Sequence, residues 1–532
     1  MFRRSSAALG AAAVLATIAA APASAALPPI SKAPSTTTDP YVLPVAPGVH
    51  TQSLLTTGDS VGGVKMAGIP DGLGAFAQDG GSFGLLMNHE LPNTAGNVRA
   101  HGQNGAFVSK WSIDRRSHAV TAGSDLIQPG VKYWDYRSRA YVASSDLLPG
   151  LVNPDGSFNT FSPAFARFCS ATLSAPGQFY NRRSGRGTES PLYFANEENG
   201  DEGRVFGVTL DGQAQQLPRL GLFSWENSVP ADTRSDRTLV VGNEDGGAGQ
   251  LWIYRGTKRA TGNDFDKAGL TNGSSYVVNV PGAPNDAKFR QDHPKGQEVP
   301  FDINQIDWNS SGKQQNAEAV ADGIALNRVE DGAWDPRHAN DFYFVTTEGA
   351  PRPDGSDGGG LWRLRFEDLN EPELGGTLTR LLDGNESWGT GQPGAYKPDN
   401  LEIDRDGNLL IQEDPGGADH VARILAYDIS TGARGVVAKF DPKQFTPGQP
   451  KFITNDEESS GIIDARSFLG RGWYVFDAQV HKTISPDPDG LVQMGQLMLL
   501  KVDDFDYIYG NSGAKDRHVD DESDDEGRGG DS

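Results

Sequence analysis

The feature that most constrains the fold of this chain is a unit of three short runs, each suited to a β-strand, that recurs along the sequence. The unit is clearest between Asn327 and Phe366, where NRVEDGAWD, DFYFVTTEG and GGLWRLRF are separated by turn-forming residues. The second run is apolar and ends on an acid, Glu348. The third run alternates apolar residues with Arg363 and Arg365, which is typical of a half-exposed strand.

The second and third runs occur six times in the same order. The acids that end the second run are Glu90, Glu197 and Glu198, Glu244 and Asp245, Glu348, Glu413 and Asp414, and Asp477. The first run is less regular, and its positions are occupied by Asp71, Cys169, Glu226, Glu330, Asp399 and Glu458. One small sheet cannot bury its faces alone, so this repeat predicts a closed radial array of sheets. We therefore expect an all-β fold, a six-bladed β-propeller with inserted loops after Glu90 and after Gly249.

Acids at equivalent strand ends predict a metal site. In a propeller the inner strand ends of all blades point to one central channel, so these acids are expected to meet there. Crowded carboxylates repel one another unless a cation lies between them. The alternative is that individual acids are solvated turn residues, because many of them stand beside Gly or Asn.

The two ends of the chain differ from the repeat region. Arg3 and Arg4 precede an Ala-rich apolar run, and residues 23–25 (Ala-Ser-Ala) form a small-residue cleavage site, so we expect a signal peptide at residues 1–25. The arginine pair indicates twin-arginine export, although ordinary secretory signals also carry such pairs. No other stretch is long and apolar enough to span a bilayer. The expected protein is secreted or periplasmic.

The expected domain order follows from these patterns. Residues 26–50 include a stretch rich in Pro, Ser and Thr and are expected to form an N-terminal arm. Residues 51–510 form the propeller, which is the expected catalytic domain. Residues 511–532 are acidic, and we expect a disordered tail because like charges without apolar residues do not form a core.

Charge and cysteine content limit the possible partners. The net charge of −23 repels nucleic acid and anionic membranes but tolerates divalent cations. Cys169 is the single cysteine, so no intrachain disulfide can form. Two readings of Cys169 stay open: a small buried residue, which is the commoner fate of a free cysteine, or a thiolate ligand of a metal.

Several motifs together resemble the PhoX family of secreted alkaline phosphatases. These motifs are NHE at Asn88–Glu90, the cysteine segment before EEN at Glu197–Asn199, GNED before QLWIYRGTK, NRVEDGAWDP, and KPDNLEIDRDGNLLIQED. They occur in order from about Val61 to about Lys482. The resemblance implies a six-bladed propeller, export by the twin-arginine route, and Fe3+ and Ca2+ in the channel.

The resemblance also implies roles for individual residues. Iron ligands are implied at Glu90, Cys169, Glu330, and either Glu244 or Asp245. Arg328, in an Arg-x-Glu motif, is implied to hold phosphate. Calcium ligands are implied at Asp399, Glu197 and Glu198. This chain departs from the family at GNED, which replaces a GDDE-like motif, and after Cys169, where an inserted loop rich in Arg and Gly follows.

The expected function is therefore that of a metal-dependent phosphatase, an alkaline phosphatase-like enzyme that hydrolyses phosphate monoesters. A thiolate with carboxylates suits ferric iron, and carboxylates with carbonyls suit calcium. The expected partner is a small phosphorylated substrate, and the protein is expected to be a monomer. Two alternatives stay open: a calcium-dependent lactonase or esterase-type propeller, and a non-catalytic, calcium-stabilised binding propeller. Phosphate bound beside Arg328 would distinguish the first reading from the others.

Overall fold

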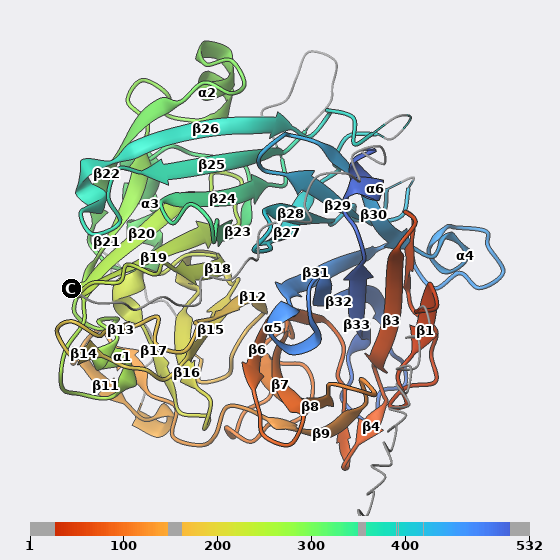
Figure 1. The fold of residues 1–532 in the computed structure, drawn as a ribbon. Helices are drawn as coiled ribbons and strands as arrows, with labels where there is room; N and C mark the ends of the chain where they lie inside the picture. The colour runs from red at the N-terminus through yellow and green to blue at the C-terminus, as the bar shows by residue number, and fades with distance from the viewer. Residues whose placement is uncertain are drawn as a thin grey trace, which may run out of the picture.

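The computed structural model describes residues 27–146, 162–348, 358–389, 391, 393–418 and 420–510. These residues form an all-β, propeller-like fold whose sheets are arranged around a central axis (Figure 1). The signal peptide expected at residues 1–25 and the tail expected at 511–532 lie outside the described residues. Among the described helices, none combines the length and apolar character needed to cross a membrane.

Each run of the repeat forms a strand. The first runs are the inner strands β6 (Pro70–Ala77), β12 (Phe168–Leu173), β18 (Trp225–Pro230), β23 (Val329–Trp334), β27 (Pro398–Ile403) and β31 (Glu457–Asp464). The second runs are β7 (Ser82–His89), β15 (Leu192–Glu197), β19 (Arg237–Glu244), β24 (Asp341–Thr346), β28 (Asn408–Glu413) and β32 (Trp473–Thr483). The third runs are β8 (Phe107–Asp114), β16 (Val205–Thr209), β20 (Leu251–Thr257), β25 (Gly360–Phe366), β29 (Arg423–Asp428) and β33 (Gln493–Val502). Within each unit the strands pair antiparallel in this order.

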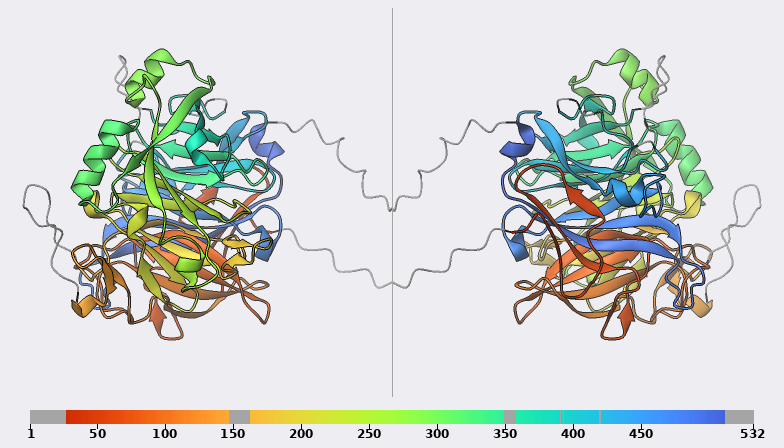
Figure 2. Two further views of the ribbon diagram at one scale, coloured as in Figure 1. Left: turned by 90° about the vertical axis from the view of Figure 1, so that its left-hand side faces the viewer. Right: turned by 90° about the vertical axis from the view of Figure 1, so that its right-hand side faces the viewer.

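A fourth, outer strand completes each unit, and the sequence analysis did not predict it. These strands are β9 (Val120–Asp125), β17 (Ala214–Gln216), β21 (Ser274–Asn279), β26 (Gly376–Asp383), β30 (Arg434–Phe440) and β3 (Val49–Thr56). Strand β3 lies near the N-terminus but pairs with β33 near the C-terminus, so the first and last described parts of the chain close the array (Figure 2).

The expectation of six separate blades is not met. Four sheets are blade-like, with the orders β6-β7-β8-β9, β12-β15-β16-β17, β2-β30-β29-β28-β27 and β1-β3-β33-β32-β31, in which β1 is Ile30–Lys32 and β2 is Val42–Pro44. The fifth large sheet has nine strands, because β22 (Val299–Ile306) pairs with both β21 and β26 and joins two of the expected units. The two end strands of this sheet, β18 and β23, come together where Asn227 Nδ2 donates to Asp331 Oδ1 at 2.6 Å, so the sheet nearly closes on itself. The sequence analysis had treated the segment that contains β22 as an inserted loop.

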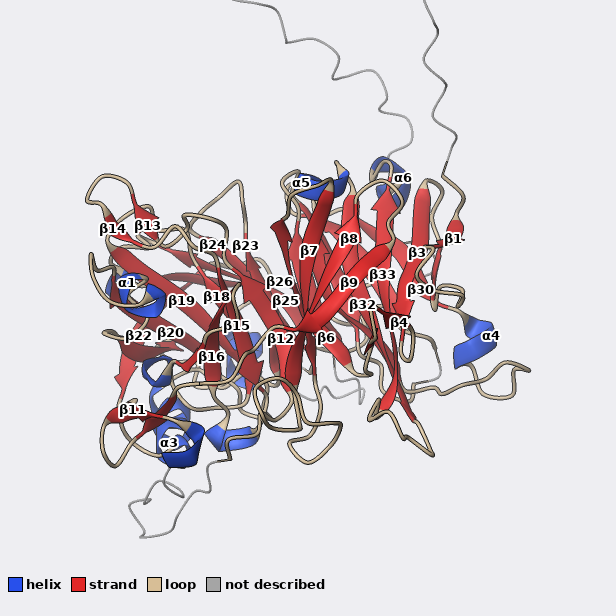
Figure 3. Cartoon of the chain, turned by 90° about the horizontal axis from the view of Figure 1, so that it is seen from below, coloured by secondary structure: helices blue, strands red, loops and turns tan. Residues whose placement is uncertain are grey.

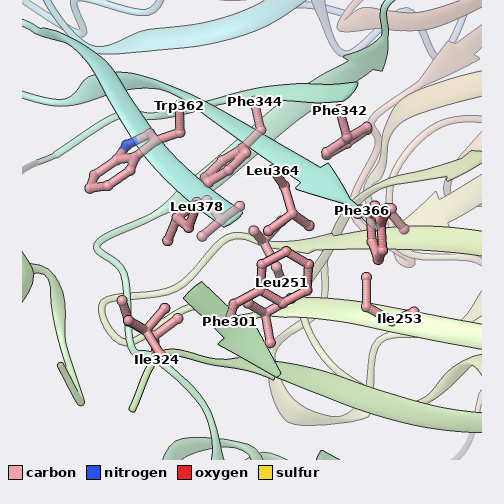
Figure 4. Close-up of a cluster of buried hydrophobic side chains, with 14 of the residues drawn as sticks. Leu251, Ile253, Phe301, Ile324, Phe342, Phe344, Trp362, Leu364, Phe366 and Leu378 are labelled. Carbon is pink, nitrogen blue, oxygen red and sulfur yellow. The ribbon is translucent and has the colours of Figure 1, made fainter. Parts of the chain in front are cut away.

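The nine-stranded sheet surrounds one hydrophobic core (Figure 4). Leu251 and Ile253 of β20 face Phe344 and Trp362 of β24 and β25, and all four are fully buried. Phe301 of β22 lies in the same core. Burial of each large apolar side chain stabilises a fold by roughly 1.5–3 kcal/mol, so β22 is an integral part of the structure.

The residues expected to form an N-terminal arm contribute edge strands. β1 (Ile30–Lys32) pairs parallel with β3, and β2 (Val42–Pro44) pairs antiparallel with β30. The N–H of Tyr41 donates to Gln496 Oε1 at 2.8 Å. The described part of this segment is thus attached to two neighbouring sheets.

Short helices and hairpins lie at the ends and outer rim of the strands (Figure 3). The helices are α1 (Asp264–Lys267), α2 (Asp286–Asp292), α3 (Gly312–Asp322), α4 (Pro442–Phe445), α5 (Arg466–Leu469) and α6 (Asp506–Tyr509). Two-stranded hairpins are formed by β4 (Ser60–Val61) with β5 (Val64–Lys65), β10 (Tyr133–Asp135) with β11 (Ala140–Val142), and β13 (Tyr180–Asn181) with β14 (Arg186–Gly187). A pocket of about 290 Å³ on the axis, here called the channel, is lined by residues of all six inner strands.

Candidate metal centre

The second residue of each inner strand occupies an equivalent place, here called the slot. The slot residues are Asp71, Cys169, Glu226, Glu330, Asp399 and Glu458. In the first five strands the pairing register shifts at the slot, as in a β-bulge. A bulge redirects a side chain that regular pleating would place on the face of the sheet. In these five strands the bulges are therefore a local reason that the slot side chains reach the axis, whereas Glu458 joins the same series of acids from a strand in regular register at the slot.

The backbone just before the slot is also unusual. Ile69, Arg167, Arg328 and Lys397 each lie two residues before a slot residue, and their φ angles are 48°, 44°, 56° and 49°. Left-handed backbone at a non-glycine residue costs on the order of 1–3 kcal/mol and is enriched at functional sites. Three of these four residues are cationic, so the repeat places positive side chains beside the slot.

The slot residues and the acids that follow the second strands form four groups of possible metal ligands. In each group the ligand atoms lie within 4.8 Å of one another. The groups are Asp71–Glu90–Cys169, Cys169–Glu198–Glu226, Glu226–Glu330–Asp399 and Asp399–Asp414–Glu458. Neighbouring groups share a residue, so they form a continuous series, here called the ligand chain.

Cys169 belongs to two of the groups. Its Sγ lies 3.0 Å from Glu226 Oε2 and 3.5 Å from Asp71 Oδ2, and the residue is 8% exposed. Burial, and next the negative charge of Asp71, raise the pKa of the Cys169 thiol well above its usual range. A cation at this place would reverse that effect and favour the thiolate.

At one end of the ligand chain, Arg167 connects two of the groups. Its Nη2 lies 2.7 Å from Glu90 Oε1 and also contacts Glu198. Burial and the charge of Glu90 raise the pKa of Glu198 to about 8. The other carboxylate oxygen of Glu90 accepts a hydrogen bond from Gln479 Nε2 at 3.2 Å.

Arg328 lies at the equivalent place before Glu330. Its Nε and Nη2 donate to the two carboxylate oxygens of Asp245, at 2.9 and 3.1 Å, and Nη2 is also 3.0 Å from Glu330 Oε1. Thr347 Oγ1 donates to the same oxygen of Glu330 at 2.7 Å. Arg328 therefore holds two of the acids that the resemblance implies, and Asp245 lies beside the ligand chain without belonging to it.

At the other end of the ligand chain, Glu458 contacts a histidine to which the sequence analysis gave no role. Glu458 Oε1 is 3.3 Å from His481 Nε2, and His481 Nδ1 is 2.9 Å from Gln493 Oε1. Burial and the charge of Asp414 raise the pKa of Glu458 to about 8. Burial lowers the pKa of His481, but the hydrogen bond to Glu458, the charge of Glu458 and the hydrogen bond to Gln493 together outweigh this and raise the pKa to about 10.

Besides Asp245, two residues implied as ligands are not brought into the ligand chain. Glu197 accepts from Arg204 Nε at 2.5 Å and from Arg204 Nη2 at 2.8 Å, within one blade. Glu244 accepts from Trp252 Nε1 at 2.8 Å, and burial raises its pKa to about 8. Each is the last residue of its second strand, and in both cases the next residue is the one that lies near the axis.

The sequence analysis gave no individual ligand role to five residues of the site: Asp71, Glu226, Asp414, Glu458 and Arg167. The four acids were among the acids of the repeat that were expected to meet in the channel, and Asp71, Glu226 and Glu458 occupy the slot. Arg167 could have been found from its spacing, because it precedes Cys169 as Arg328 precedes Glu330.

The residues present fit the metals that the resemblance implies. The two groups with Cys169 offer a thiolate and carboxylates, a donor set suited to Fe3+, and the other two groups offer only carboxylates, which suit Ca2+. Asp477 of β32 is fully buried, and neither of its carboxylate oxygens has a hydrogen-bond partner among the described residues. Burial and the charge of Glu458 raise its pKa well above its usual range. Asp477 is therefore a buried acid without a compensating partner among the described residues.

Comparisons with known proteins give a likeness of fold. No family model matches the chain, and no curated protein matches its sequence. Among solved structures, PhoX of Pseudomonas fluorescens, in complex with vanadate, a transition state analogue, has a TM-score of 0.61 and 13% identity, covering 87% of this chain and 97% of that chain. An α-L-arabinanase of Penicillium chrysogenum with arabinobiose has a TM-score of 0.40 and 8% identity, covering 87% and 99%. The first match shows a PhoX-like fold, and the second is too distant to carry an argument.

Proposed function

We propose that this protein is an exported, monomeric phosphatase that hydrolyses phosphate monoesters with Fe3+ and Ca2+ held by the ligand chain. The observation that carries the proposal is the ligand chain itself. Four groups of donor atoms, each within 4.8 Å, are built from one thiol and from acids at equivalent places of a PhoX-like fold.

The donor types divide the ligand chain between the two metals. Asp71, Glu90, Cys169, Glu198 and Glu226 would hold Fe3+, because these groups contain the thiol. Glu330, Asp399, Asp414 and Glu458 would hold Ca2+, together with the shared Glu226. Glu330, which the resemblance assigns to iron, stands in a group of carboxylates only. When bound, such ions supply neutralisation of phosphoryl oxygens and a water of lowered pKa.

Protein hydrogen bonds orient the ligands in advance. Ser170 Oγ donates to Glu226 Oε1 at 2.7 Å, and Cys169 Sγ lies near the other oxygen. Thr347 fixes one oxygen of Glu330 in the same way. Because these contacts restrict side-chain rotation, the donor atoms are held near the positions that a bound ion requires.

Arg328, two residues before Glu330, is suited to hold acids of the site in place. A guanidinium offers a planar fork of N–H donors, which matches a carboxylate or a phosphoryl group and which lysine cannot reproduce. In Arg328 this fork holds Asp245 and also contacts Glu330. Arg328 thereby keeps one acid in the ligand chain and another beside it.

The test combines metal analysis of the purified full chain with hydrolysis of p-nitrophenyl phosphate. We expect bound iron and calcium, and a rate that disappears with chelator and returns with both metals. Glu226→Gln should lose metal and rate, because Glu226 is shared by two groups. Glu298→Gln, on an exposed residue paired with Arg363, is the matched control and should behave as the parent.

Three outcomes would contradict the proposal. Protein that holds iron and calcium but does not hydrolyse phosphate esters is not a phosphatase. Hydrolysis of lactones without hydrolysis of phosphate esters would support the lactonase or esterase reading instead. Calcium binding without either activity would support a binding propeller.

A further inference from the structure

Asp477 is an acid at a position where the other units of the repeat bury an apolar residue. In each unit the residue before the slot pairs with a residue of the second strand, and Asp477 lies three positions before that partner, Val480. The residues at the corresponding position of the other five units are Leu86, Phe194, Val241, Tyr343 and Leu410. All five are buried and belong to hydrophobic core clusters. A packing role therefore does not explain an acid at this position.

The carboxylate of Asp477 has no compensating partner inside the protein. The residue is fully buried, and neither of its oxygens has a hydrogen-bond partner among the described residues. Glu458, on the neighbouring strand β31, adds negative charge and raises the pKa of Asp477 further. A buried polar group without a partner destabilises a fold, so each such group calls for a partner of another kind, such as a bound ion.

A further unpartnered oxygen lies on the same side of β32. Gln479 follows Asp477 by two positions, so the two side chains point to the same face of the strand. Gln479 Nε2 donates to Asp71 Oδ2 at 2.9 Å, whereas its Oε1 is buried and has no partner among the described residues. This face of β32 therefore offers unpartnered oxygens toward Asp71 of the inner strand β6.

The backbone leaves room between Asp477 and β6. Gly461 of β31 has a φ of 60°, and a Cβ there would lie 3.0 Å from Asp477 Oδ2 and 2.9 Å from the carbonyl oxygen of Asp71. A side chain at this position would clash with both oxygens. Because the residue is glycine, the Asp477 carboxylate and the Asp71 carbonyl face one common space.

We propose that Asp477 is a ligand of a further calcium ion, held between β32 and β6 by the Asp477 carboxylate, the carbonyl oxygen of Asp71 and Oε1 of Gln479. Asp477 belongs to none of the four groups of the ligand chain. The donors are all oxygens and combine a carboxylate with carbonyls, which is the donor set that Ca2+ prefers.

The position of this site explains why the sixth unit carries the acid. Asp71 belongs to the first group of the ligand chain and Glu458 to the last, and their strands β6 and β31 are neighbours. A calcium ion beside Asp477 lies where the ligand chain is open, and it closes the series of metal positions into a ring. The inference goes beyond the proposed phosphatase activity, because this site binds calcium whether or not the protein hydrolyses phosphate esters.

The experiment counts the calcium ions bound by the full chain after dialysis against calcium, by mass spectrometry of the metals, with iron measured on the same samples. Asp477→Leu gives the sixth unit an apolar residue like those of the other five. It should hold about one calcium ion fewer per chain, with iron unchanged, because the only carboxylate ligand of the site is lost. Asp477→Asn keeps the shape of the side chain and should weaken one calcium position by about tenfold or more, because calcium affinity depends on the number of charged ligands. Asp292→Asn, on an exposed acid paired with Lys288, is the matched control and should bind calcium as the parent does.

Urea unfolding provides a second measurement that distinguishes a calcium ligand from a packing residue. Without metal, Asp477→Leu should be at least as stable as the parent, because a buried carboxylate without a partner is replaced by an apolar side chain. With calcium, the variant should gain less stability than the parent, because a ligand that binds the folded state stabilises it.

The outcomes separate this inference from the proposed function. Calcium number and affinity like those of the parent in both Asp477 variants overturn the inference, and so does a metal-free Asp477→Leu that is less stable than the parent but gains as much from calcium. If Asp477→Leu does not fold, Asp477→Asn decides by its calcium affinity. A parent that binds no calcium overturns the inference and the calcium part of the proposed function together. A parent that loses this calcium in the variants but does not hydrolyse phosphate esters contradicts the phosphatase proposal alone.

Discussion

Glu197 and Glu198 are neighbours in sequence, but their carboxylates differ in the positive charge that lies beside them. Glu197 is fully buried, and its two oxygens accept from Arg204, with a further bond from the N–H of Ala166 at 3.0 Å. Glu198 lies beside Glu90 and Cys169, among other acidic groups. The first carboxylate has its countercharge within the blade, and the second shares one arginine with another acid.

The same division occurs at Glu413 and Asp414. Glu413 accepts from Arg423 Nε at 2.8 Å within its own blade, whereas Asp414 belongs to the last group of the ligand chain. In both units the last residue of the second strand is paired inside the protein, and the following residue reaches the axis. Burial alone therefore does not identify a metal ligand. Glu197 and Glu413 are buried, but each already pairs with an arginine of its own blade.

The largest expected effect comes from breaking a paired acid. Glu197→Gln leaves the buried guanidinium of Arg204 without a countercharge, and loss of one partner of a buried ion pair typically costs about 3–5 kcal/mol. Glu198→Gln removes one charge from a group of like charges, so we expect the metal-free protein to lose no stability or to gain some. Urea unfolding of the two metal-free variants measures the difference. Equal losses of unfolding free energy in the two variants would show that Glu197 and Glu198 do not differ in how their charges are compensated.

The second-largest expected effect comes from adding a cation to the ligand chain. A cation that binds only the folded state stabilises it by RT ln(1 + [L]/Kd), about 2.7 kcal/mol at a 100-fold excess over Kd. We expect calcium to raise the unfolding midpoint of the chelator-treated protein, and the gain to be smaller in Glu458→Gln. A midpoint that stays the same after complete metal removal would contradict the assignment.

The pH dependence of the metal-free protein sharpens this second test. The pKa values of Glu198 and Glu458 are raised from 4.5 to about 8 in the folded state. For a raised pKa the stabilising contribution is fully present below the unfolded value and is lost as pH rises through the folded value. The metal-free protein should therefore lose stability between about pH 4.5 and 8, and calcium should reduce this slope. If the free energy of unfolding of the metal-free protein stays constant or rises with pH in this range, Glu198 and Glu458 do not have the raised pKa values expected of crowded acids.

Part of the fold could be predicted from the sequence. The three runs of each unit were visible because their strands are largely buried and end in turn residues. The outer strands were not visible: β9, for example, is half exposed and reads VTAGSD, which carries little apolar pattern. The joining role of β22 depends on pairing with β26, as of Val299 with Leu378 and Phe301 with Gly376, and local patterns do not encode a pairing between residues so far apart in the chain.

The candidate site was predicted in outline, but two pairs of neighbouring acids were left undecided. No pattern in the sequence distinguishes Glu197 from Glu198, or Glu244 from Asp245. Successive side chains of a strand point to opposite sides, so the choice depends on where the strand ends. That point is set by pairing, as in the register of Phe168 with Glu197. The slot was predicted more accurately, because its residues recur at one position of each unit.

The smallest expected effect on stability, and the sharpest on metal content, comes from Cys169→Ser. Cys169 is buried as a packing residue would be, yet it belongs to two groups of the ligand chain. Serine is similar in size, so a packing role predicts a loss of only about 1–2 kcal/mol from burial of a hydroxyl, with metal and activity kept.

A ligand role predicts a different result for the same variant. Iron content, any absorption from thiolate-to-iron charge transfer and the phosphatase rate should fall, while calcium held by Asp399, Asp414 and Glu458 remains. Metal analysis, visible spectra and urea unfolding of the metal-free form separate the two roles, because the metal-free stability reports packing alone. Ser174→Ala, at a buried serine in the segment after β12 and outside the ligand chain, controls for small changes of packing. If Cys169→Ser keeps the iron and the kcat of the parent, Cys169 is a packing residue, and the two groups that contain it do not form an iron site.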